Sequence, residues 1–288
     1  MNVIEFFEAM DRNPLLLSGM LAGALASVAC GMVGPFVVTR RIVFLSGAIA
    51  HIAVGGIGAA VFLNHHWPGA FGWLEPIHGA IVFSLLGALI IGVVHEHAQE
   101  RTDTLIGAMW AVGMSVGILL IKYTPGYQTE LMSYLFGNIA TVDRIDVVRI
   151  AVLDVVILGV LMLFGKRLLA QCLDPQFAML QGVGRLTTNL VLLAVVALTV
   201  VTLVQIVGLI LVIALLTLPA ATAGHHLHRM AGIMIASIIL CLLLTSLPRI
   251  AVYGTGMSPE SAIVLAAGGV YLLSVLLVRA RQRLRHMG

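Results

Sequence analysis

The composition of this chain of 288 residues indicates a protein whose solvent is lipid. Hydrophobic residues make up 60% of it, and its 30 glycines raise the apolar share to roughly 70%, against about 45–50% for a soluble domain. Charged residues make up 10% and the formal net charge is only +3, whereas about 25% charged residues is usual. Too few polar side chains remain to cover a water-facing surface, which excludes a soluble enzyme, a disordered chain and a nucleic-acid-binding protein.

Nine apolar runs are long enough to cross a bilayer as helices, which takes about 20 residues each. In chain order they are residues 15–38, 44–63, 77–95, 104–122, 145–165, 188–205, 207–224, 231–247 and 261–278. Residues 131–142 are also apolar, but at about 1.5 Å per residue they reach only about 18 Å across a core about 30 Å thick. We therefore predict an all-α, polytopic integral membrane protein with nine spans, one re-entrant or interfacial segment, and a single transmembrane domain over residues 1–288.

Basic residues set the expected orientation. With the amino terminus outside and nine crossings, eleven of the 16 Lys and Arg residues lie on the inner side, as the positive-inside tendency requires. The loop 64–76 has no Lys or Arg and contains Trp67 and Trp73, which suits an outer interface. We expect the cytoplasmic (inner) membrane as the location, with a cytoplasmic carboxyl terminus.

Small residues and one histidine share a face of the second run. Gly47, His51, Gly55 and Gly58 recur at helical spacing, so a neighbouring backbone can approach closely there, and His51 faces protein or a pore rather than lipid. Two interpretations stay open. His51 is either hydrogen-bonded between helices or a transient ligand for a divalent cation, since neutral imidazole suits zinc and other first-row metals.

A carboxylate lies in the middle of the fifth run. A charged Asp at that depth costs roughly 2.5–3.5 kcal/mol on insertion scales, so Asp154 is a candidate functional residue. The alternative is a protonated group, or one that is hydrogen-bonded to Ser or Thr on a neighbouring span. The sequence leaves open whether His51 and Asp154 share one cavity.

Other histidines lie at the ends of runs. His65 and His66 fall in the predicted outer loop, and His78 is at the start of the third run. Together they could bind a metal ion at the outer side of the membrane. A second group falls at the inner ends of spans, where interfacial polar residues are common, and we interpret it mainly as solvated surface; its members are His95, His97, His225, His226 and His228.

Two strings resemble catalytic or nucleotide-binding motifs. Residues 113–117 match the hydrolase nucleophile string around Ser115, but that motif works on a strand-to-helix turn, and small residues four apart in an apolar helix are better explained by close packing. Gly165-Lys166 is followed by Arg167 and lacks the glycine five residues upstream that a P-loop needs. We expect no enzyme activity in this chain, so a transport process driven by ATP needs a separate ATPase.

The inner loop 166–187 contains a predicted short helix. Asp174 can cap it, with Pro175 at its first position. Phe177, Met179 and Leu180 then supply an apolar face of the kind that fits a partner's groove. The alternative is an amphipathic helix that rests on the membrane.

Six strings in order along the chain are similar to those of one transporter family. They are Arg40-Arg41, residues 46–51 (SGAIAH), 101–107 (RTDTLIG), 130–137 (ELMSYLFG), 174–182 (DPQFAMLQG) and 207–223, which begins Val-Gly and ends LPAATA. Any one string is weak evidence, but the ordered set is specific and covers nearly the whole chain. It resembles the membrane permease of the zinc and manganese ABC importers.

The resemblance implies a transmembrane permease domain with several partners. These are two cytoplasmic ATPase subunits, a second permease copy in a homodimer, and an extracytoplasmic metal-binding protein. The divalent metal is then the substrate, and no cofactor is bound permanently. Carried over by position, His51 matches the family's metal-pathway histidine. The ATPase-contacting loop corresponds to residues 174–182 and includes Asp174, Pro175, Phe177, Ala178 and Gly182.

One departure from the family pattern affects the metal site. Many members have an acidic residue four positions before the histidine, where this chain has Gly47. We expect Asp154 or Glu130 to supply the missing carboxylate, or else a different metal preference. The predicted function is inward transport of zinc, manganese or iron by alternating access. The alternatives are a permease for metal chelates such as siderophores or corrinoids, a proton-coupled carrier that uses Asp154, and an intramembrane hydrolase that uses Ser115.

Overall fold

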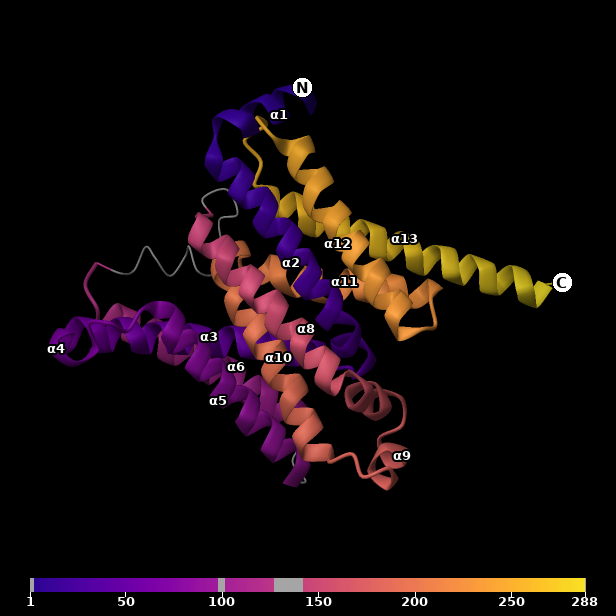
Figure 1. Ribbon diagram of the computed structural model, residues 1–288, viewed down its shortest axis with the longest axis horizontal. Helices are drawn as coiled ribbons and strands as arrows, with labels where there is room; N and C mark the ends of the chain where they lie inside the picture. The colour runs from indigo at the N-terminus through magenta and orange to yellow at the C-terminus, as the bar shows by residue number, and fades with distance from the viewer. Residues whose placement is uncertain (1–2, 98–101, 127–141, 288) are drawn as a thin grey trace. The chain divides into compact units, whose positions relative to one another are not determined.

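The computed structural model describes residues 3–97, 102–126 and 142–287, and within these ranges the chain is helical, without strands (Figure 1). The nine predicted spans coincide with nine long helices in the described ranges, except that the helix expected over 207–224 begins two residues later, at Leu209. This confirms the all-α, multi-pass fold. The long helices are α2 (Pro14–Thr39), α3 (Val43–His66), α5 (Pro76–His97), α6 (Thr102–Lys122), α8 (Arg144–Leu173), α10 (Arg185–Val207), α11 (Leu209–His226), α12 (Met230–Val252) and α13 (Pro259–Met287). The short helices are α1 (Val3–Arg12), α4 (Pro68–Phe71) and α9 (Pro175–Leu180). The predicted re-entrant segment, apart from its last residue, and Glu130 lie outside the described residues.

Proline and glycine mark several helix boundaries. Pro14 is the first residue of α2, where its missing N–H costs nothing, and the Asn13 side chain accepts a hydrogen bond from the Leu15 N–H at 3.0 Å. Gly208 separates α10 from α11 and has φ of 88°, a conformation that glycine adopts without steric cost. Two spans therefore follow one another with a single residue between them.

The fifth span is longer than the sequence analysis predicted. We placed residues 166–173 in a loop because Lys166 and Arg167 end the apolar run, but α8 continues to Leu173. Lys and Arg are good helix formers, so charge ends the membrane-buried part of a helix and not the helix itself. The loop proper begins at Asp174.

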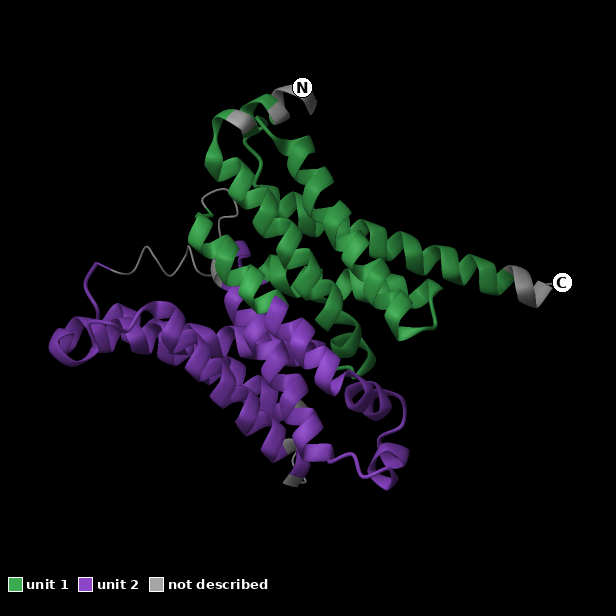
Figure 2. Cartoon of the chain, viewed as in Figure 1, with its two compact units in different colours: residues 1–41, 138–154, 210–288 green, residues 42–137, 155–209 purple. Residues whose placement is uncertain are grey.

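The chain forms two compact units (Figure 2). Unit 1 comprises residues 1–41, 138–154 and 210–288, and unit 2 comprises residues 42–137 and 155–209. In unit 1, α2 packs along α12: Ser27 Oγ lies 3.1 Å from Thr245 Oγ1, and Gly31 leaves room for Ile238.

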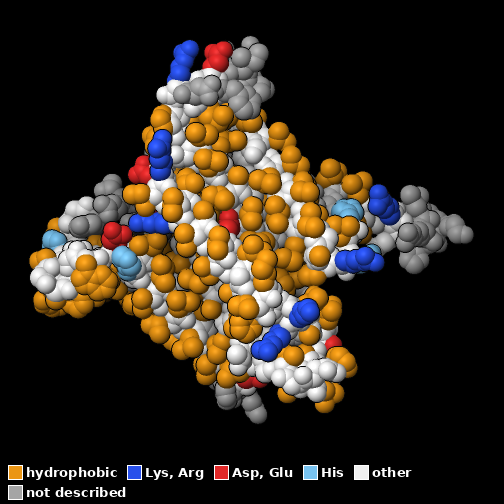
Figure 3. All heavy atoms as spheres, viewed as in Figure 1, with side chains coloured by type: hydrophobic (Ala, Val, Ile, Leu, Met, Phe, Trp, Pro, Cys, Tyr) orange, Lys and Arg blue, Asp and Glu red, His pale blue; other side chains and the backbone are white. Residues whose placement is uncertain are grey.

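In unit 2, α3 is the central helix. It packs against α5, α6 and α10, and most of its length is buried. Outward-facing positions on other helices stay apolar, for example Met162 and Leu163 of α8, which are 76% and 78% exposed. Hydrophobic side chains cover most of the face shown in Figure 3. This is the surface expected of helices that face lipid.

Glycines bring α3 and α6 into close backbone contact. A Cβ added at Gly55 would lie 2.8 Å from the Gly113 carbonyl oxygen, and one added at Gly58 would lie 2.6 Å from that of Gly117. The predicted close approach at Gly55 and Gly58 is confirmed. The string around Ser115 lies within α6 as a packing surface, with no strand-to-helix turn, as its spacing indicated.

We expect Gly58→Ala to destabilise the protein by about 1–3 kcal/mol, because the new methyl group meets backbone that cannot move aside. Gly107 of α6 is the matched control, since a Cβ there meets nothing within 4 Å. Gly107→Ala should stabilise by about 0.5–1 kcal/mol by restricting the unfolded chain. Thermal unfolding of the purified variants measures both, and shifts of the same sign would contradict the close approach.

Candidate functional site

The ring of His51 is held between two partners in unit 2. Its Nδ1 lies 2.8 Å from the carbonyl oxygen of Gly47, one helical turn earlier. Its face lies against Trp110 of α6, with ring centroids 4.4 Å apart and an interplanar angle of 33°. The side chain is half-buried, and it contacts protein on the α6 side.

The bond to Gly47 determines which nitrogen of His51 can bind a ligand. A carbonyl oxygen only accepts hydrogen bonds, so Nδ1 carries the proton and Nε2 keeps its lone pair. Metal-bound histidines characteristically donate their other ring N–H to a carbonyl or carboxylate in this way. Gly47 thus contributes its backbone oxygen at the position where the resemblance described above implies a carboxylate. This contact was not predicted, although the four-residue spacing of Gly47 and His51 on one helix was the available signal.

Asp154 is a buried carboxylate in α8. The residue is 9% exposed, and neither carboxylate oxygen has a hydrogen-bond partner among the described residues. That observation gives no support to the interpretation in which Asp154 is bonded to Ser or Thr. Such an oxygen pair is costly to bury alone and is suited to bind a cation.

The structure does not assemble a complete metal site within the described residues. No group of three His, Cys, Asp or Glu side chains there is close enough to hold one ion, so the three outer histidines do not form the metal-collecting cluster that we expected. His51 belongs to unit 2 and Asp154 to unit 1, and a cavity that both share stays a prediction. Glu130 falls outside the described residues.

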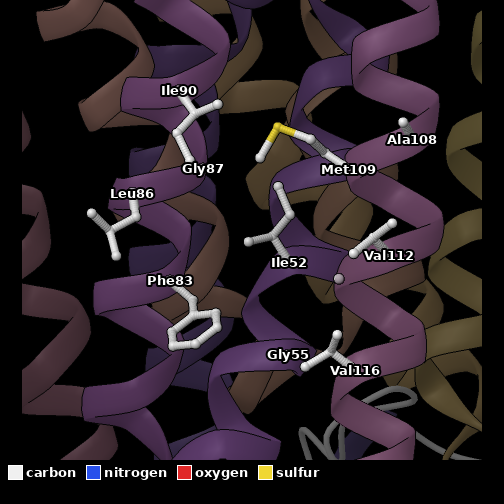
Figure 4. A pocket seen from close by; sticks show the side chains of 11 residues that line it. Ile52, Gly55, Phe83, Leu86, Gly87, Ile90, Ala108, Met109, Val112 and Val116 are labelled. Carbon is white, nitrogen blue, oxygen red and sulfur yellow. The ribbon is translucent and has the colours of Figure 1, made fainter.

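An apolar cavity of about 360 Å³ lies beside α3 and is lined by residues of α3, α5 and α6 (Figure 4). Its larger lining side chains are Ile52, Phe83, Leu86, Ile90, Met109 and Val112. None of these side chains offers an oxygen or nitrogen to replace the hydration shell of a metal ion. The cavity is therefore excluded as a cation site, although Ile52 follows His51 directly in the chain.

The predicted short helix in the inner loop is confirmed as α9. The Asp174 side chain caps it by accepting hydrogen bonds from the N–H groups of Gln176 and Phe177, both at 3.0 Å, and Pro175 is the first residue. After the helix, Gly182 adopts φ of 75°, and its N–H donates to the Met179 carbonyl at 3.0 Å. Gly182 therefore terminates α9 by adopting the left-handed conformation.

Most apolar side chains of α9 face away from the rest of unit 2. Ala178 is buried, whereas Phe177, Met179 and Leu180 are 58%, 54% and 85% exposed. In Figure 1, α9 lies in the connection between the ends of α8 and α10. The exposed face is large for so short a helix, and the chain offers it no partner among the described residues.

Polar contacts hold the two ends of the segment that joins α8 to α10. Gln171 at the end of α8 donates from Nε2 to the Arg185 carbonyl oxygen at 3.1 Å. The Arg185 guanidinium, at the start of α10, lies 3.1 Å from Glu96 Oε2 of α5. Both α5 and α10 also pack on α3, the helix that carries His51.

Long apolar helices packed around a central helix, with an exposed capped helix between two of the spans, are the features of a multi-pass membrane protein. A model of the ABC 3 transport family matches residues 12–278. The match covers most of the chain, and the chain belongs to this family. The resemblance stated from the sequence is thereby confirmed.

Similar proteins cover almost the same length. A Chlamydia trachomatis protein named "Probable metal transport system membrane protein" is 35% identical over 93% of this chain and 90% of its own. The manganese import system permease protein ScaB of Streptococcus parasanguinis is 27% identical over 99% and 98%. Among solved structures, PsaBC from Streptococcus pneumoniae in complex with Fab is similar, with a TM-score of 0.83, 28% identity and 95% of both chains covered.

Proposed function

We propose that this chain is the membrane permease of an ATP-driven importer of a divalent metal ion, with manganese and zinc as the first candidates. The observation that carries the proposal is His51, whose Nε2 is left available on the central helix α3 by the bond from Nδ1 to Gly47. Family membership and the names of similar proteins support the same substrate class. The metal is cargo, held transiently and then released.

The proposed metal ligands are His51 and Asp154, with Glu130 as a further carboxylate candidate. Imidazole nitrogen combined with carboxylate oxygen suits zinc, manganese and iron. Both Asp154 oxygens lack a partner among the described residues, and bringing a cation to them offsets the cost of burying the charge. A second permease copy in a homodimer would supply an equivalent set of ligands.

The energy source in this proposal is a pair of cytoplasmic ATPase subunits that bind α9. The exposed Phe177, Met179 and Leu180 fit an apolar groove on such a partner. The permease conformations must differ in affinity for the ATP-bound partner, since otherwise no work is transmitted. In this arrangement the carboxyl terminus is cytoplasmic, and an extracytoplasmic metal-binding protein delivers the ion on the other side of the inner membrane.

Metal uptake by proteoliposomes that contain the permease and its ATPase, with the metal-binding protein on the opposite side of the membrane, tests the proposal. We expect free manganese or zinc to accumulate only with ATP on the ATPase side. Uptake of siderophore or corrinoid chelates in place of free ions would identify a chelate permease instead. Uptake without ATP under a pH gradient would identify a proton-coupled carrier.

Replacement of Asp154 by asparagine tests the carboxylate ligand. The amide keeps the shape but loses the charge, and we expect the half-saturating metal concentration for uptake to rise at least about tenfold. Asp146→Asn is the matched control on the same helix. Asp146 lies in the first turn of α8, is partly exposed and pairs with Arg149 at 3.1 Å, so its loss should leave uptake nearly unchanged. Unaltered uptake by Asp154→Asn would remove this carboxylate from the site.

A further inference from the structure

A polar cavity of about 430 Å³ lies in unit 1, at the end of α11 and beside the last part of α13. The residues that line it are His225, His226, His228, Val278, Arg281 and Gln282. From the sequence we interpreted the three histidines as solvated surface. In the structure His226 and His228 are exposed and His225 is half-buried, in agreement with that interpretation. The three also line one cavity, together with the guanidinium group of Arg281 from a helix that is distant in the sequence.

A buried hydroxyl fixes two of the rings. Ser274 of α13 is 4% exposed, and its Oγ lies 3.0 Å from His225 Nδ1 and 2.9 Å from His226 Nε2. The His225 ring is also stacked on Tyr271, with ring centroids 5.6 Å apart. Ser274 has one hydroxyl proton, so it donates to one ring and accepts from the other. The ring that accepts from Ser274 presents its other nitrogen as an N–H donor, and the ring that donates to Ser274 presents a second N–H only when it is protonated.

The charge of this region favours an anion. Residues 209–288 contain a single acidic residue, Glu260. It lies in the first turn of α13, and Arg281 follows it 21 residues later, which is about 30 Å along a helix. Arg279 and Arg283 add further positive charge near the cavity end. A divalent cation here would meet guanidinium groups with no carboxylate in the lining, and no described group of three side chains can hold a metal.

The place of the cavity along α13 indicates which anions reach it. Arg281 lies just past the apolar run 261–278, which puts the cavity at the depth of lipid headgroups. Histidine and Lys or Arg side chains lie together near the end of α13 in Figure 3. Arginine matches the geometry of phosphate oxygens with two parallel N–H donors, and the imidazole nitrogens and the Gln282 amide add neutral or charged donors.

We propose that this cavity binds a phosphate group, either on the headgroup of an anionic lipid or as free inorganic phosphate. Arg281 supplies the charge and the forked donors, while His225 and His226, held by Ser274, supply positioned ring nitrogens. This site is separate from the metal ligands. Its test does not use transport as a readout.

Native mass spectrometry of the purified full-length permease tests the proposal, with phosphatidylglycerol, phosphatidylcholine and inorganic phosphate as separate probes. We expect retention of phosphatidylglycerol over phosphatidylcholine. Arg281→Gln should weaken that retention about tenfold, as expected for loss of one charge-assisted contact. Arg279→Gln is the matched control, because it removes the same charge from the same helix at a residue that does not line the cavity.

The outcomes separate the phosphate source from a general effect of charge. Arg281-dependent binding of phosphatidylglycerol supports the lipid source, and Arg281-dependent binding of inorganic phosphate alone supports the free anion. Equal losses in Arg281→Gln and Arg279→Gln would overturn the proposal, as would an absence of binding to either probe. His226→Gln, with an unchanged unfolding temperature without lipid, should weaken binding as well. Retention at the wild-type level in that variant would remove the histidine from the site.

Discussion

Replacing His51 with alanine is expected to abolish metal uptake while leaving the permease folded and assembled. The substitution removes the only nitrogen ligand in the proposed site. Loss of a partner that merely orients a metal ligand already costs about 10–100-fold in metal affinity, so loss of the ligand itself should cost at least about 100-fold. The initial rate of manganese or zinc uptake into proteoliposomes, measured against metal concentration, gives the effect directly.

His66 provides a close control on the same helix. Its Nδ1 lies 3.0 Å from the Phe62 carbonyl oxygen, and its ring lies against that of Phe62, with centroids 4.1 Å apart. His66 thus repeats the bonding of His51 at the exposed end of α3, away from the middle of the span. His66→Ala should transport at nearly the wild-type rate. Equal losses in the two variants, or normal uptake by His51→Ala, would refute a specific role for His51 in the metal path.

The spans could be predicted because a bilayer imposes length and composition on every crossing helix. The same reasoning placed the end of the fifth span too early, since hydropathy locates the membrane boundary and α8 continues into the polar region to Leu173. Gly55 and Gly58 could be identified as packing residues because small residues recur at helical spacing within a single helix, and that pattern is visible in the sequence.

Contacts between distant segments left no comparable pattern in the sequence. Trp110 lies on a different helix from His51, and nothing in the residues around either one indicates the other. Likewise, Ser274 and His225 are 49 positions apart, so the histidines at the end of α11 could not be assigned a partner in advance. Local motifs such as the Asp174 cap are predictable, because all of their atoms come from a few consecutive residues.

The second large effect is expected on the coupling between ATP hydrolysis and transport. Leu180 is the most exposed apolar side chain of α9, at 85%, and Leu180→Asp places a charge in the middle of the surface that we assign to the ATPase. A side chain central to an interface contributes about 2 kcal/mol or more, so we expect the affinity for the ATPase to fall at least about 30-fold. ATP-dependent uptake should be lost with it.

The control for this variant carries the same charge on the same helix. Gln176 is exposed and lies in the first turn of α9, where an acidic side chain is favourable to the helix. Gln176→Asp should therefore keep both ATPase binding and uptake. Co-purification of the ATPase with each variant measures the contact, and metal binding by the isolated permease checks that His51 is unaffected.

The same pair of variants distinguishes the two interpretations of α9. If α9 rests on the membrane surface, Leu180→Asp weakens a lipid contact, and the ATPase still co-purifies at the wild-type level. If α9 is seated in the ATPase, binding and transport fall together while metal affinity stays constant. Because Gln171 and Arg185 hold the ends of the connection, the substitution should act on the exposed face without unfolding the segment. A loss of metal affinity in Leu180→Asp would contradict the separation between α9 and the metal path.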